Sequence, residues 1–330
     1  VGIIFAADLF NVFVFLEVAA LTGYALVGAA GGKSLVYAFR YLVLGSFGAT
    51  LYLLGVGHIY VATGTLNMGD LAVRLPELMT STAVVSGFIY IFLGLSIKMA
   101  LIPLHSWLPD AYASAPSSIT PLLASTVTKV ALLAWVRIEY SLIAPNVEVS
   151  HVPVLVLLEE LGVFAALIGG ALALIQTDLK RMFAYGGISH IGLILIGVSI
   201  GNATGFAGGL FYLINDAIMQ AALFMIAGAL VHYHGIHTLE DLRGVGQQSP
   251  WLTGALVVVA VAMVGLPPTG GFFGKWNIIL GALEAEHYLA AFAVVASTLL
   301  TLAYFLKIFS CWFHQPQSSS SEPLQIAGAL

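Results

Sequence analysis

Charged residues and cysteines are scarce in this sequence, and both scarcities exclude classes of protein. Lys, Arg, Asp and Glu together form 8% of the 330 residues, whereas about a quarter of the residues in soluble domains are charged. The one cysteine, Cys311, cannot form a disulfide framework within the chain, and no CxxC motif or Cys/His cluster occurs. The sequence therefore predicts a membrane protein without a metal site, and we expect no cofactor on this chain.

Motifs of other functional classes are also missing. No HExxH or P-loop pattern is present, so metalloprotease or nucleotide chemistry has no support. The net charge of −5 comes without a basic stripe, which excludes nucleic acid as an expected partner. The alternating strands of about ten residues that are typical of membrane barrels do not occur either.

Long apolar runs fill the chain instead, which is 60% hydrophobic and has a mean hydropathy of +1.00. A helix needs roughly 20 apolar residues to cross the lipid core. Nine segments meet this length: 3–29, 35–62, 82–107, 118–141, 154–176, 184–201, 206–233, 251–283 and 288–313. The predicted fold class is an all-α, polytopic transmembrane helix bundle surrounded by lipid. Since the chain starts at Val1 and no signal peptide precedes the first span, we expect part of a longer protein.

Cations in the connections between spans predict the orientation, because Lys and Arg are enriched on the inner side of membranes. With residue 1 outside, the outer connections hold only Arg74. The inner connections then contain Lys33, Lys180, Arg181 and Arg243, with Arg40 close by. We therefore predict an outer first residue and an inner C-terminus, followed by a polar tail over 314–330.

Two spans are interrupted by prolines near the middle of the membrane. Pro103 interrupts the first, and Pro267 with Pro268 interrupts the second. A lysine accompanies each break, Lys98 before the first and Lys275 after the second. Paired broken helices that run in opposite directions indicate a transport site between inverted repeats.

Four ionisable residues lie deep within the apolar spans: Glu17, Lys98, Lys129 and Lys275. A central charge costs about 2.5–3.5 kcal/mol, so four unpaired charges would cost roughly 10 kcal/mol. We expect these side chains to face the interior and to pair there, where amines and carboxylates can exchange protons. The alternative is that a lysine reaches the interface or satisfies a carbonyl at a kink, and for Lys307, near a span end, both interpretations stay open.

His190 and Asp216 could extend such a relay of protonatable groups. Both lie in apolar surroundings, in "YGGISHIGLILIG" and "LFYLINDAIMQAALF". A single His or Asp in a helix is equally explained as a hydrogen-bonded structural group. The sequence leaves this choice open.

Several motifs together resemble the antiporter-like proteins of the complex I superfamily and, among these, the D subunit of Mrp-type cation/proton antiporters. The motifs that carry the resemblance are "DLFNVFVFLEVAALTGYALVG", "ATGTLNMGDLA", "KMALIPLHSWLPDAYASAPSSIT", "TVTKVALLAWVRI", "TDLKRMFAYGGISHIG" and "GLPPTGGFFGKWNIILGALE". The resemblance covers nearly all of 1–313.

The resemblance implies a fold and roles for particular residues. Family members have about fourteen helices with two inverted five-helix repeats, so the spans here would be the fifth to the thirteenth. Residues 1–313 would form one proton-translocating domain, with most of the first repeat in 1–143 and the second in 154–313. By motif, Glu17 matches the fifth-helix glutamate, Lys98 and Lys129 match the lysines of the seventh and eighth helices, and Lys275 matches the ionisable residue of the twelfth.

One departure from the family pattern lies in the eleventh helix of that scheme. Many members carry "NHA…K", whereas this chain reads "NDAIMQAALF", with Asp216 at the histidine position and Gln220 at the lysine position. Asp216 would then supply a compensating protonatable group, or the cation selectivity would differ.

The sequence favours a subunit that moves protons, in exchange for Na⁺, within the inner or plasma membrane and together with other membrane subunits. The rival hypothesis is a proton-pumping subunit of an NADH:quinone oxidoreductase or hydrogenase complex, with the redox chemistry on other chains. A third is a scaffold whose Gly-rich faces only pack against partners.

Overall fold

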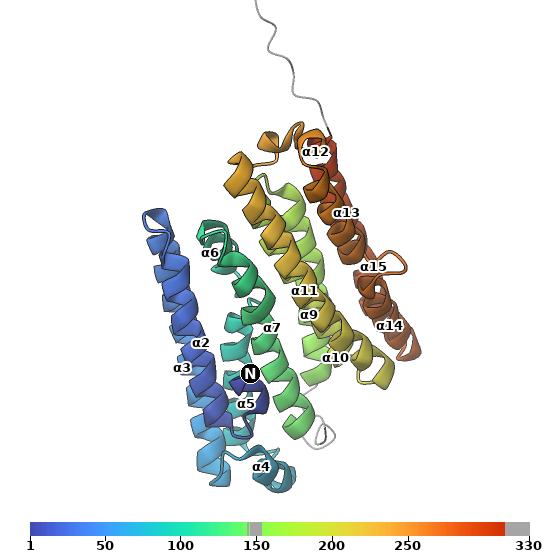
Figure 1. Ribbon diagram of the computed structural model, residues 1–330. Coiled ribbons are helices and arrows are strands. Elements are labelled where there is room, and N and C mark those ends of the chain that lie inside the picture. Colours follow the sequence, from blue (N-terminus) through green and yellow to red (C-terminus); the bar gives the residue numbers. More distant parts are fainter. Residues whose placement is uncertain (144, 146–153, 314–330) are drawn as a thin grey trace, which may run out of the picture.

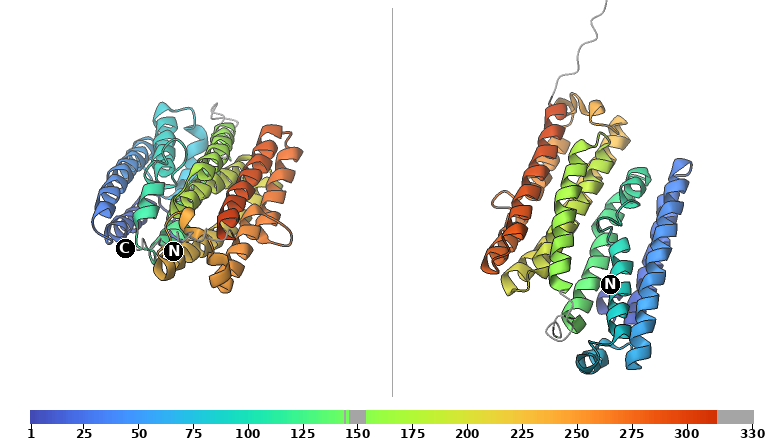
Figure 2. Two further views of the ribbon diagram at one scale, coloured as in Figure 1. Left: turned by 90° about the horizontal axis from the view of Figure 1, so that it is seen from above. Right: turned by 180° about the vertical axis from the view of Figure 1, so that it is seen from behind.

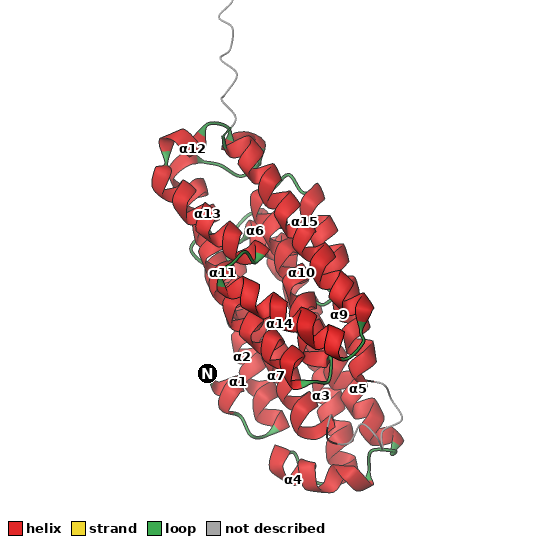
Figure 3. Cartoon of the chain, turned by 90° about the vertical axis from the view of Figure 1, so that its right-hand side faces the viewer, coloured by secondary structure: helices red, strands yellow, loops and turns green. Residues whose placement is uncertain are grey.

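The computed structural model describes residues 1–143, 145 and 154–313, and over these residues it contains helices and no strand (Figure 3). Seven helices are long and apolar enough to cross a membrane, one of them α7 together with the π-helical turn η2 that follows it. They are α2 (Leu9–Gly28), α3 (Lys33–Thr63), α7 (Thr120–Ile138), α9 (Val154–Ile175), α10 (Leu179–Ser199), α11 (Ala203–His234) and α15 (Tyr288–Trp312). The predicted helical bundle is confirmed, and the predicted tail over 314–330 lies outside the described residues.

The two remaining spans are each built from two helices. The first comprises α5 (Thr82–Lys98) and α6 (Leu108–Ser114), and the second comprises α13 (Pro250–Val264) and α14 (Gly270–Glu284). Pro103 lies in the first connection and Pro267 with Pro268 in the second, where proline lacks the N–H that would continue the helix. The bonds Ile102–Pro103 and Pro267–Pro268 are cis. The two predicted breaks are therefore present.

Short helices close both ends of the bundle. They are α1 (Gly2–Phe5), α4 (Met68–Arg74), η1 (Leu75–Glu77), the π-helical turn η2 (Glu139–Ile143), η4 (Glu240–Leu242) and α12 (Val245–Gln248). Figure 1 places α4 at one end and α12 at the other, and Figure 2 shows the segments up to α7 beside those from α9 onward. The connections that carry the predicted inner cations lie at the end of α12.

A corner of the same design occurs at each end. Asp8 caps α2 and pairs with Asn67 in an isolated β-bridge, and Asp178 caps α10 and pairs with Thr238 in the same way. An Asp side chain suits this position because it accepts hydrogen bonds from the free N–H groups of the first turn. The chain thus uses one local solution twice, once at each end of the molecule (Figure 1).

The two helix breaks also match residue for residue. Ala100 has φ 56° and Gly265 has φ 85°, both left-handed. The next residue in each break reaches back five positions, since Leu101 N–H donates to Ser96 O at 2.9 Å and Leu266 N–H to Val261 O at 3.0 Å. In this register, Asp110 of α6 corresponds to Lys275 of α14.

Glycines allow the closest contact between neighbouring helices. A Cβ atom on Gly192 of α10 would lie 2.4 Å from Ala166 N and 2.6 Å from Gly162 O of α9. Small residues allow such backbone contact between membrane helices. Helix α10 is buried along almost its whole length, so His190 in its middle lies inside the bundle.

Candidate functional site

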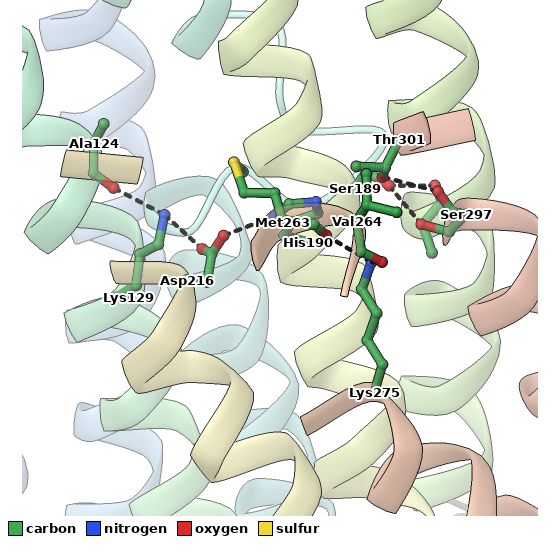
Figure 4. Close-up of polar contacts among 11 residues, drawn as sticks. Ala124, Lys129, Ser189, His190, Asp216, Met263, Val264, Lys275, Ser297 and Thr301 are labelled. Atoms are coloured by element: carbon green, nitrogen blue, oxygen red, sulfur yellow. Dashed lines mark hydrogen bonds and ion pairs between the residues drawn. The ribbon is translucent and has the colours of Figure 1, made fainter. Parts of the chain in front are cut away.

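Three helices bring a lysine, an aspartate and a histidine together in the centre of the bundle (Figure 4). Lys129 Nζ of α7 lies 3.0 Å from Asp216 Oδ2 of α11, and His190 Nδ1 of α10 lies 2.8 Å from Asp216 Oδ1. Each side chain is at most 5% exposed. The two oxygens of one carboxylate therefore contact two bases, one on each side.

Because these side chains are buried, each charged group needs a close partner, and the same short distances allow proton transfer between them. An isolated charge in a low-dielectric interior costs several kcal/mol, and a close opposite charge offsets that cost. Lys129 also donates to the Ala124 carbonyl at 2.8 Å, so its ammonium has two oxygen partners. The three groups are protonatable and in direct contact, which is the geometry that a proton relay requires.

Lys275 lies near this group, on the second half of a broken helix. Its Nζ donates to the carbonyls of Met263 at 2.9 Å and Val264 at 3.2 Å, which the end of α13 leaves free (Figure 4). The ring of Tyr212 lies near both Lys275 and His190: Lys275 Nζ lies 5.7 Å from the Tyr212 ring centroid, and the ring centroids of Tyr212 and His190 are 5.7 Å apart.

The other predicted pair is formed by Glu17 of α2 and Lys98, the last residue of α5. Lys98 Nζ donates to Glu17 Oε1 at 2.6 Å, with the lysine side chain 7% and the glutamate side chain 23% exposed. A cavity of about 250 Å³ adjoins Lys98 and extends between Tyr24, Trp107 and the near face of α7. Since one water molecule takes up about 30 Å³ in the liquid, this space can hold several.

The structure keeps these two centres apart. Within the described residues, no hydrogen bond or ion pair joins Glu17 and Lys98 to the group of Lys129, Asp216 and His190. Pro103, Pro267 and Pro268 shape the two breaks. Lys307 donates to the carbonyls of Leu174 and Gln176, both at 2.9 Å, and so caps the end of α9, which favours the structural interpretation of this lysine.

Several buried polar residues were not recognised as site residues from the sequence. Lys180 is 7% exposed although its sequence position indicates a connection between spans, and Glu139 is fully buried. Ser189 Oγ and Ser297 Oγ lie 3.0 Å apart beside His190 (Figure 4). The sequence does contain an indication that Lys180 lies in a helix, because Asp178 two residues earlier is a helix cap and places Lys180 inside α10.

The described residues contain no group of three or more His, Cys, Asp or Glu side chains that could hold a metal ion. The polar atoms of the site are instead distributed as pairs and short chains between amines, carboxylates and carbonyls. The chemistry that this arrangement supports is proton transfer.

Comparisons with known proteins find relatives among the membrane subunits of two kinds of complex. The family described as "NADH:quinone oxidoreductase/Mrp antiporter, TM" matches residues 6–301. The N subunit of the NADH-quinone oxidoreductase of Desulforudis audaxviator is 42% identical over 307 residues, which are 93% of this chain and 61% of that protein. The D subunit of the Na(+)/H(+) antiporter of Alkalihalophilus pseudofirmus is 36% identical over 97% of this chain and 64% of its own length.

A solved structure shares the fold. A chain of the Mrp complex from Dietzia sp. DQ12-45-1b superimposes with a TM-score of 0.88 at 31% identity, covering 96% of this chain and 59% of the other. The present chain thus spans about three fifths of the length of the relatives it matches. Its structural relatives are subunits of multi-subunit membrane complexes.

Proposed function

The chain belongs to the NADH:quinone oxidoreductase/Mrp antiporter family of transmembrane proteins, and from this premise we propose that it translocates protons as a subunit of a membrane complex, in exchange for Na⁺. The chain is a multi-pass membrane protein, in agreement with its apolar helices and its relatives. The antiport activity is named for relatives such as the D subunit of the Na(+)/H(+) antiporter, and the proposal extends it to the protein of which this chain forms a part.

The observation that carries the proposal is the buried contact of Lys129 with Asp216 and of Asp216 with His190. A scaffold would gain nothing from it, because buried ion pairs are often no more stabilising than apolar residues of similar size. A relay needs groups of this kind, placed within hydrogen-bond distance of each other.

We assign the two exchange sites to the two halves of the chain. Glu17 and Lys98 would serve the half over 1–143, and Lys275 the half over 154–313, with Lys129, Asp216 and His190 between them. The matched corners and breaks of the two halves support this division into repeats, because each feature occurs once in each half and the two corners lie at opposite ends. The cavity beside Lys98 would bring water to the first exchange site.

A second candidate function is supported by a specific observation. The relative that is 42% identical is a subunit of an NADH-quinone oxidoreductase. In such a complex the same charged groups would pump protons under the drive of redox chemistry on other chains. Purification of the native complex separates the two candidates: small hydrophobic antiporter subunits favour Na⁺/H⁺ exchange, and flavin or iron–sulfur proteins favour the redox complex.

The test of proton translocation uses the complete complex in sealed vesicles. Lys98→Ala or Glu17→Ala should abolish proton movement while the complex still assembles, because each leaves the other group without its partner at 2.6 Å. Lys33→Ala is the control, since Lys33 is an exposed lysine at a helix end. Normal translocation by both variants would refute the roles assigned to this pair.

A further inference from the structure

We propose that the first turn of α10 clamps the half-helix α6 and thereby couples the two charged centres, with Asp110, Lys180 and Arg181 as positioning residues. The proposal rests on the proton-translocating function proposed above and adds the mechanical link between its two halves.

The first contact of the clamp is an ion pair between the halves. The Arg181 guanidinium of α10 donates to Asp110 Oδ1 of α6. The second carboxylate oxygen of Asp110 lies 3.7 Å from Arg40 of α3. One carboxylate therefore lies between two guanidinium groups, one from each half of the chain, and a small shift of α6 would exchange one partner for the other.

The second contact holds the opposite end of α6. Lys180 Nζ donates to the carbonyl of Ala115, the residue that ends α6, at 3.2 Å and to Ser117 Oγ at 3.1 Å. The lysine is 7% exposed, and its partners here are neutral oxygens. Two consecutive residues of α10, Lys180 and Arg181, thus bind the two ends of the short helix α6.

The clamp is connected along the chain to both charged centres. Trp107, which precedes α6, donates its indole N–H to the carbonyl of Ile97 at 2.9 Å, next to Lys98. On the other side, His190 follows Arg181 by nine residues of α10, about 14 Å at 1.5 Å per residue. In this proposal, a displacement of α6 beside the break that follows Lys98 is transmitted along α10 to His190.

The register of the two breaks gives independent support. Asp110 occupies the position that Lys275 occupies in the second half, counted from the left-handed residues Ala100 and Gly265. Both half-helices therefore carry an ionisable residue at the same place. Lys275 is bonded to carbonyls of its own broken helix, whereas Asp110 is bonded to the other half, as a coupling element requires.

Stability alone does not account for the clamp. Arg181 and Arg40 are 40% and 62% exposed, and ion pairs at such sites contribute little to stability. Burial of the Lys180 ammonium against neutral oxygens is unfavourable compared with an apolar side chain. If the contact couples the two halves, proton translocation should depend on whether the side chains at 110 and 181 carry opposite charges, and not on which of the two is positive.

The experiment is a charge exchange in the complete complex, reconstituted in vesicles and driven by whichever of a Na⁺ gradient or NADH drives the unaltered complex. Asp110→Arg and Arg181→Asp should each lower proton translocation about tenfold, within the usual range of coupling between sites. The double variant should restore part of the rate, because the pair between positions 110 and 181 forms again with exchanged signs while Arg40 loses its acidic partner. Arg243→Asp, an exposed arginine at the same end of the molecule, is the control and should behave like the unaltered complex.

Milder variants keep the test decisive if a charge reversal prevents assembly. Arg181→Gln and Lys180→Met remove a positive charge without reversing it and should lower translocation several-fold in an assembled complex. Unchanged rates in these variants, or single reversals that the exchange does not rescue in an assembled complex, overturn the clamp. An unaltered complex that moves no protons overturns the proposed function instead, so the two failures are distinguishable.

Discussion

At the scale of single residues, the carboxylate of Asp216 is the centre of the site. It contacts Lys129 on one side and His190 on the other, at 3.0 and 2.8 Å. The departure of this chain from the family's "NHA" motif therefore places a negative charge between two basic groups. Gln220, the second departure, is fully buried and its amide packs over Gly187.

Variants of Lys129 and Asp216 should affect the stability of the protein and its proton translocation differently. Lys129→Met leaves Asp216 with one partner fewer, and breaking a buried pair costs roughly 3–5 kcal/mol, which should lower the unfolding temperature of the purified protein. The double variant Lys129→Met with Asp216→Leu should recover part of that stability, because neither member of the ion pair is left unpaired although His190 loses its hydrogen-bond partner, but it should not recover proton translocation. A double variant that transports protons at the normal rate would show that the pair is structural.

The sequence predicts which residues are buried and charged better than it predicts their partners. Glu17, Lys98 and Lys129 are recognisable because each interrupts a long apolar run. The ion pair of Asp110 with Arg181 was not foreseen, since the partners are 71 residues apart and meet only once α6 and α10 pack together. Hydropathy contains no information on such distant contacts.

At the scale of helices, the predicted spans are all present and their limits follow local chemistry. The span predicted over 184–201 begins earlier, at Leu179, because Asp178 caps the helix there and accepts the N–H of Arg181 at 2.8 Å. The span predicted over 82–107 is helical only to Lys98, since the chain turns left-handed at Ala100. Apolar length identifies a span, but capping and backbone conformation decide where its helix begins and ends.

Close contact of α9 with α10 yields a prediction for glycines. Gly192→Ala would place a methyl group against backbone atoms of α9 at 2.4 Å, and overpacking of this kind costs about 1–3 kcal/mol. Gly57→Ala is the matched control, because no atom lies within 4 Å of its added carbon and alanine favours a helix by up to about 1 kcal/mol over glycine. Thermal unfolding of the two variants in detergent should show a loss for the first and no loss for the second. Equal stability would show that the two helices can move apart without cost.

At the scale of the whole molecule, the two halves are related by matched features at opposite ends. The corner of Asp8 and Asn67 lies at the end of α4, and the corner of Asp178 and Thr238 lies at the end of α12 (Figure 1). The clamp of α6 by α10 then joins the halves at the end of the predicted inner cations.

The predicted sidedness determines the direction in which protons would enter, and it can be measured on the assembled complex in cells. Cys311→Ser removes the only cysteine of the chain, and Val73→Cys or Lys33→Cys then places a single thiol at an exposed position at either end. Because Lys and Arg gather at the end of Lys33, a membrane-impermeant maleimide should label Val73→Cys in intact cells. It should label Lys33→Cys only after the membrane is opened. The reverse labelling pattern would show that the molecule has the opposite orientation in the membrane. The cavity beside Lys98 and the clamp at Asp110 would then face the opposite compartment, and the proton path through the two halves would run from the other side.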